Sequence, residues 1–225
     1  MGQKGFSKQI DGANGLHHWG IRNDFFLTNV KIVLFFYRHD RKSVARWKPS
    51  GASISNSDYQ VSKLPTQQFG ASLEWIRVNN NDQLIPPIMN ICMDFLSKPD
   101  NLETEGIFRK SGNASQIKEL MAKINNGERI VFSQGDVHIA AVILKTFLKE
   151  LEEPLLTFKL YENIISIESV PKDDRLVIIK SILEQLPPQN YVVLQHLVEF
   201  LSLVSIFIIF NRKEPKTLQN FFYCF

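Results

Sequence analysis

Cysteine is scarce in this sequence, and the common catalytic motifs are missing. Cys92 and Cys224 are the only thiols in 225 residues. Two cysteines this far apart do not form a disulfide scaffold, so we expect a reducing, cytoplasmic setting. No glycine-rich phosphate-binding motif and no serine-hydrolase motif occurs, and the five histidines lack partners at metal-ligand spacing. The chain is therefore predicted to hold no metal and no nucleotide cofactor of its own.

Long uninterrupted apolar runs are also missing. Residues 25–37 are apolar and rich in β-formers, but Asn29 and Lys31 interrupt them. Residues 200–210 are too few to cross a bilayer, and His196 and Glu199 block their extension. We therefore disfavour a tail anchor at residues 200–210 and interpret residues 25–37 as a strand or a fragment of another domain.

The charge is unevenly distributed along the chain. Residues 1–66 hold ten Lys/Arg against four Asp/Glu, a net charge of +6, whereas residues 67–225 hold sixteen against nineteen, a net charge of −3. Residues 50–66 are rich in Gly, Ser, Asn and Pro, which is typical of a linker. We interpret residues 1–66 as a solvated basic extension, expect no nucleic acid, and leave a weak peripheral membrane contact as the alternative.

Apolar residues between positions 67 and 205 recur at intervals of three and four, which predicts amphipathic helices. No competing alternation of period two occurs, so the predicted fold class is an all-α helical bundle. The first helix begins at Pro86–Pro87 and buries Cys92 with its apolar neighbours. The second is capped by Asn113 or Ser115 and ends at Asn126–Gly127.

Three further helices complete the predicted bundle. The third is capped by Asp136, ends at Pro154 and carries Ala141, Lys145 and Lys149 on one face. The fourth spans about 173–186, and the fifth begins near Asn190. Composition and periodicity together thus place a helical domain at 67–205, followed by a hydrophobic tail at 206–225.

One loop motif suggests chemistry. Arg109 lies in Thr104-Glu-Gly-Ile-Phe-Arg-Lys-Ser-Gly112, between two glycines that suit a loop entering a partner's cleft. An arginine so placed offers a planar, doubly donating group to a phosphate. The pattern is short, however, and on spacing alone an ordinary surface arginine is the favoured interpretation. For Lys145, the alternative to a functional role is an ordinary solvated helix lysine.

Several blocks in a fixed order resemble the GTPase-activating domain of Rho-family regulators (RhoGAP). They are Gln67–Leu73, Ile85–Pro87, Thr104–Gly112, Ile143–Leu156 and Asn190–Leu194. Their details look most like the subgroup with an upstream Sec14-like lipid-binding domain, for which residues 1–60 are too short.

The resemblance implies a function and a set of site residues. Arg109 would be the arginine finger, inserted into a small GTPase of the Rho, Rac or Cdc42 type that itself holds the GTP and Mg²⁺. The lysine matching Lys145 steadies the finger loop in the family and contacts the GTPase. Lys149 stands where the family usually has arginine, so a weaker contact is expected there. The chain would regulate an enzyme rather than be one.

The carboxyl end departs from the family pattern. Members continue into a segment of the form Asn-Leu-Ala-x-x-Phe-Gly-Pro, whose asparagine contacts the GTPase, and nothing in this sequence matches it. We therefore expect a domain truncated at its C-terminal helices, with residues 206–225 as a divergent tail. The alternative function is a GTPase-binding or scaffold module that does not accelerate hydrolysis.

Overall fold

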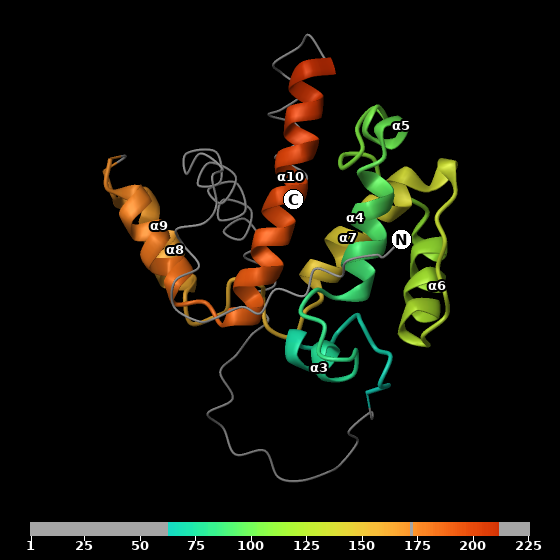
Figure 1. Ribbon diagram of the computed structural model, residues 1–225, viewed down its shortest axis with the longest axis horizontal. Helices are drawn as coiled ribbons and strands as arrows, with labels where there is room; N and C mark the ends of the chain where they lie inside the picture. The colour runs from blue at the N-terminus through green and yellow to red at the C-terminus, as the bar shows by residue number, and fades with distance from the viewer. Residues whose placement is uncertain (1–62, 172, 212–225) are drawn as a thin grey trace, which may run out of the picture.

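The computed structural model describes residues 63–171 and 173–211 (Figure 1). Within these ranges every regular element is a helix, which confirms the predicted all-α class. The expectations for residues 1–62, including the basic extension and the segment 25–37, lie outside the described residues. So do those for residues 212–225 of the expected tail.

Three short to medium helices begin the described domain. Helix α3 spans Leu73–Val78, α4 spans Pro87–Leu96 and α5 spans Pro99–Leu102. The hydroxyl of Ser72 caps α3 by accepting a hydrogen bond from the backbone N–H of Trp75 at 3.1 Å. Proline stands at the first position of both α4 and α5, where its missing N–H breaks no intrahelical bond. The predicted start of the first long helix is thus confirmed.

Helix α6 (Ala114–Asn125) begins and ends as its sequence predicts. Asn113 is the cap, because its Oδ1 accepts from the backbone N–H groups of Ser115 and Gln116 at 2.9 and 3.3 Å. After the helix, Gly127 adopts φ +79°, a left-handed conformation that favours glycine. Of the two predicted cap residues, Asn113 is therefore the one that caps the helix, because its side chain reaches the N–H groups of the first turn.

Helix α7 (Val137–Lys149) differs from its predicted form at both ends. The carboxylate of Asp136 does not cap it; it accepts from the N–H and the hydroxyl of Ser133 at 2.8 and 2.6 Å. Asp136 thereby closes the short 3-10 helix η2 (Gln134–Asp136). The helix ends at Lys149 rather than at Pro154, because the next residue, Glu150, already leaves helical geometry. Leu151 is still buried, but it lies beyond the helix.

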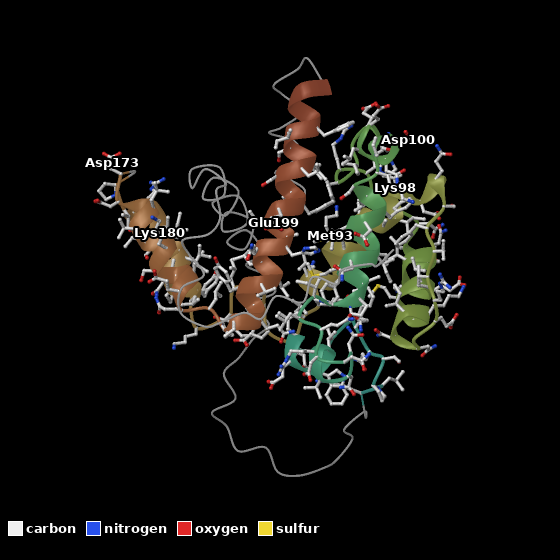
Figure 2. The ribbon with its side chains drawn as sticks, viewed as in Figure 1. Met93, Lys98, Asp100, Asp173, Lys180 and Glu199 are labelled. Atoms are coloured by element: carbon white, nitrogen blue, oxygen red, sulfur yellow. The ribbon has the colours of Figure 1, made fainter. Side chains whose placement is uncertain are left out.

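The centre of the core lies where α4 packs on α7. On α4, Cys92 is buried together with Ile88, Phe95 and Leu96, as its apolar spacing predicts. On α7, Ala141 is fully buried although it shares the predicted face of Lys145 and Lys149, and Ile143 is fully buried as well. Phe147 of α7 meets Phe69 edge to face, with ring centroids 6.1 Å apart. Met93 of α4 lies in this core, whereas Lys98 and Asp100 just beyond the helix are exposed (Figure 2).

The last helices are α8 (Tyr161–Ser166), 3-10 helix η3 (Ile167–Ser169), α9 (Arg175–Glu184) and α10 (Pro188–Asn211). Helix α9 is shorter than the predicted 173–186. Helix α10 starts at Pro188 instead of near Asn190, because proline fits a first helical turn. It stands between the α8–α9 pair and the group formed by α4, α6 and α7 (Figure 1).

Helix α10 runs through the predicted boundary at residue 205 and ends at Asn211. Among the described helices, it is the one whose length and hydropathy would suit a membrane span, over Pro188–Phe207. A core helix passes the same test. Here Leu194, Leu197 and Leu201 are buried in the bundle, so the buried side of this helix is accounted for by packing.

Residues 63–69 are attached to α6 and to the loop after α7. Oδ1 of Asn125 accepts from the N–H groups of Gln68 and Phe69, both at 2.9 Å, and its backbone carbonyl accepts from the hydroxyl of Thr66 at 2.7 Å. Lys63 forms an ion pair with Glu152. Ordered contacts therefore extend a few residues before the boundary predicted near Gln67.

Candidate functional site

The loop that carries Arg109, residues 103–112, is shaped by a turn at Gly106. This glycine has φ +68°, a conformation that other residues rarely adopt. Its carbonyl accepts from the backbone N–H groups of Arg109 and Lys110 at 2.8 and 3.0 Å. Gly106 thus makes the turn that its freedom of backbone conformation predicts.

Gly112 has a different role from the one its sequence suggests. It does not adopt a positive φ. A Cβ at this position would lie 3.2 Å from Cδ1 of Ile117 and 3.5 Å from Cγ1 of Ile139. The small size of Gly112 therefore lets the loop pack closely against α6 and α7, rather than giving it freedom to turn.

Two apolar residues fix the Arg109 loop to the bundle. Ile107 and Phe108 are both buried. The Phe108 ring meets Phe200 of α10 edge to face, with centroids 6.1 Å apart. Arg109, the next residue, is exposed. The loop thus presents an exposed guanidinium on an anchored backbone, the arrangement that a positioned cationic group needs.

Lys145 joins the loop to α7. Its Nζ donates to the backbone carbonyl of Phe108 at 2.7 Å, across 37 residues of sequence. An ammonium donor makes this a charge-assisted hydrogen bond, which is stronger than a neutral one. The family resemblance implies a lysine that steadies the loop, and the structure places the Lys145 ammonium on the loop backbone directly before Arg109.

Lys149 lies one turn further along α7 and is exposed. In the described part of the chain, Lys145 hydrogen-bonds to the Arg109 loop and Lys149 does not. As a basic residue in the last turn, Lys149 interacts favourably with the helix dipole. The structure therefore brings two of the three predicted residues together and leaves the third on the surface nearby.

Sequence reasoning missed one residue of this site. Oε1 of Glu105 lies 3.3 Å from Nη2 of Arg109, within both hydrogen-bond and ion-pair distance. The available signal was the spacing Glu-x-x-x-Arg, which places opposite charges on one side of a helical turn. That signal is weak in a loop, because it depends on the turn made at Gly106.

The buried thiol of Cys92 lies in the core rather than at this site. Burial raises the pKa of this thiol far above its usual range, so it stays protonated at neutral pH. The prediction of a buried, small apolar residue is confirmed.

Residues 86–222 match the RhoGAP domain family, and the chain belongs to this family. Rho GTPase-activating protein 8 of Mus musculus is 42% identical over 71% of this chain and 37% of its own length. Rho GTPase-activating protein 68F of Drosophila melanogaster is 41% identical over 68% of this chain and 33% of its own length.

The human Rho GTPase activating protein 15 structure has the same fold, with a TM-score of 0.61 at 24% identity, over 73% of this chain and 81% of the other. The fold is therefore a helical bundle of the RhoGAP type. The chain spans about a third of the length of the curated relatives it matches. The family match reaches residue 222, inside the segment predicted to be a divergent tail.

Proposed function

We propose that this chain stimulates GTP hydrolysis by a small GTPase of the Rho family, with Arg109 as the arginine finger. The observation that carries the proposal is the hydrogen bond from Lys145 to the Phe108 carbonyl, directly before an exposed arginine. By donating to the Phe108 carbonyl, the Lys145 ammonium restrains the backbone directly before Arg109, which is the support that a positioned finger needs. Relatives named as Rho GTPase-activating proteins support the same function.

The chemistry follows from the charge that develops during hydrolysis. Attack of water on GTP spreads negative charge over the oxygens of the γ-phosphate and the bridging oxygen, and a small GTPase alone neutralises it incompletely. The Arg109 guanidinium supplies fixed positive charge and paired N–H donors to two oxygens at once, which a lysine cannot do. A finger of this kind accelerates hydrolysis by about 10³ to 10⁵, which is about 4 to 7 kcal/mol of barrier.

Single-turnover GTP hydrolysis by a panel of Rho, Rac and Cdc42-type GTPases tests this proposal. We expect the wild-type chain to accelerate at least one of them and Arg109→Ala to lose about 10³-fold or more of that acceleration. Arg129→Ala removes another exposed arginine, just after α6, and serves as the matched control. Equal activity of Arg109→Ala and wild type would refute the assignment of the finger.

The alternative is a module that binds a GTPase or scaffold without accelerating hydrolysis. It is favoured by one sequence observation, the lack of the family's Asn-Leu-Ala-x-x-Phe-Gly-Pro segment. Titrating the chain against a GTP-loaded GTPase separates the two functions. Saturable binding with an unchanged hydrolysis rate supports the module, whereas acceleration at saturation supports the activator.

A further inference from the structure

Glu105 and Arg109 lie on the same side of the turn at Gly106. The carboxylate Oε1 is 3.3 Å from the guanidinium Nη2. The turn brings the two side chains together, because the backbone N–H of Arg109 is bonded to the carbonyl of Gly106 at 2.8 Å. The pair joins the guanidinium of the proposed finger to the carboxylate four residues before it.

The guanidinium is folded back over its own loop. A Cβ built on Gly106 would lie 3.3 Å from Nε and 3.4 Å from Nη2 of Arg109. The arginine therefore lies against the glycine instead of extending away from the loop. Ile107 and Phe108 are buried and the Phe108 carbonyl is bonded to Lys145, so the backbone is held on this side. The long side chain of Arg109 is the part free to rearrange.

We propose that Glu105 is a positioning residue that keeps the Arg109 guanidinium folded back in the free protein and releases it when a GTPase is engaged. This inference rests on the proposed function, because it concerns the same arginine. To reach a phosphate inside a partner, the side chain extends from Gly106, and this extension breaks the contact with Glu105.

Breaking the contact between Glu105 and Arg109 costs little free energy, because both side chains are largely exposed. The side chain of Glu105 is 70% exposed and that of Arg109 is 54% exposed, so water replaces the broken contact on the carboxylate. Exposed ion pairs of this kind bias an equilibrium by up to about fivefold at low salt and lose their effect as salt screens them. Glu105 thus sets how often the finger is extended, without blocking its use.

The test is a double-mutant cycle on single-turnover GTP hydrolysis, using the full chain and the GTPase that the wild type accelerates. Glu105→Gln keeps the size and hydrogen-bonding capacity of the side chain and removes its charge. We expect it to raise the rate constant at subsaturating activator by up to about fivefold at low salt. The ratio of variant to wild type should fall towards one as salt is added. In an Arg109→Ala background, Glu105→Gln should have no effect.

Glu119→Gln is the matched control. Glu119 forms another exposed i,i+4 pair, with Lys123 of α6 at 2.7 Å, so its neutralisation changes the net charge equally without touching Arg109. A rate change of the same size in this control would attribute the effect to net charge and overturn the inference. An unchanged or lower rate for Glu105→Gln would overturn it as well, as would an effect that persists without Arg109.

The resting contact is also measured without any GTPase. NMR of the free protein reports rotation about the Nε–Cζ bond of Arg109, which we expect to be slower in the wild type than in Glu105→Gln. Equal rotation rates would show that the pair does not hold the side chain. If the rotation rates differ while Arg109→Ala has normal activity, the proposed function fails and the resting contact stands. If Arg109→Ala is inactive and Glu105→Gln has the activity of the wild type, the proposed function stands and the positioning role of Glu105 fails.

Discussion

At the residue scale, Lys145 and Lys149 share one helix face but have different surroundings. Lys145 is partly buried and donates to the Phe108 carbonyl, whereas Lys149 is exposed and makes no hydrogen bond to the loop. A charge-assisted hydrogen bond contributes about 1.5 to 3 kcal/mol, and its loss leaves the carbonyl without that donor. The two lysines should therefore respond differently to the same substitution.

We predict that Lys145→Met lowers the acceleration of GTP hydrolysis by about tenfold or more, because the loop bearing Arg109 is no longer held in place. Lys149→Met, the matched control, should change it by less than about threefold. Single-turnover hydrolysis measures both, and thermal melts check that each variant is folded. Equal losses in the two variants would contradict the proposed support of the loop.

The residues of the site differ in how far the sequence alone predicts them. Arg109 and Lys145 follow from the family resemblance, and the turn at Gly106 follows from glycine chemistry. The contact between Lys145 and the Phe108 carbonyl spans 37 residues, so it depends on how α7 packs against the loop. The ion pair of Glu105 depends on how two long side chains lie around that turn, which the glycine does not specify. The candidate residues could thus be named from the sequence, but the contacts between them could not.

At the element scale, Asn125 connects the last turn of α6 to the chain segment that enters the domain. Its Oδ1 accepts two backbone N–H groups, those of Gln68 and Phe69, and both lie in a partly buried position. Removing the acceptor leaves these donors without a partner, which is costlier than losing an average hydrogen bond. This side chain thus stabilises the packing of one element on another.

We predict that Asn125→Ala lowers the free energy of unfolding by about 2 kcal/mol, because two N–H groups lose their acceptor. Asn125→Asp retains an Oδ1 acceptor and should lose less. Asn126→Ala, at the exposed neighbouring position, is the control and should change stability by less than about 0.5 kcal/mol. Urea denaturation measures all three, and similar midpoints for Asn125→Ala and Asn126→Ala would disprove the role assigned to Asn125.

Long and short elements differed in how well the sequence predicted them. Helices α4 and α6 have several turns of apolar periodicity and clear start signals, and both were predicted. Helices α3, α5 and α8 have four to six residues, too few for a periodic pattern to emerge, and were missed. The end of α7 was placed too late, because Leu151 is buried by tertiary contacts after the helix has ended.

At the scale of the whole molecule, the start of α10 ties distant parts of the bundle together. Nε2 of Gln189 donates to the Leu73 carbonyl at 2.9 Å, and Nδ2 of the buried Asn190 donates to the Leu155 carbonyl at 2.9 Å. Further along the helix, Phe200 packs on Phe108 in the Arg109 loop. Helix α10 therefore links the beginning of the described domain to the candidate site.

Residues 63–66, at the beginning of the described chain, contact three other parts of the domain. The Lys63 ammonium pairs with Glu152 and lies 5.6 Å from the centroid of the Trp75 ring, and the Thr66 hydroxyl donates to the Asn125 carbonyl. An ion pair, a cation–π contact and a hydrogen bond of this kind each contribute up to about 1 kcal/mol at partly exposed positions. Four residues that look like linker in the sequence thus belong to the folded unit.

We predict that a chain beginning at residue 63 is more stable than one beginning at residue 67 by about 1 to 3 kcal/mol, because only the longer chain retains these contacts. Urea denaturation of the two truncated chains measures the difference. Lys63→Met and Thr66→Val in the longer chain should together reproduce most of the loss, which separates side-chain contacts from an effect of the new amino terminus. Coincident unfolding curves for the two truncated chains would place the domain boundary at Gln67, where the composition alone puts it.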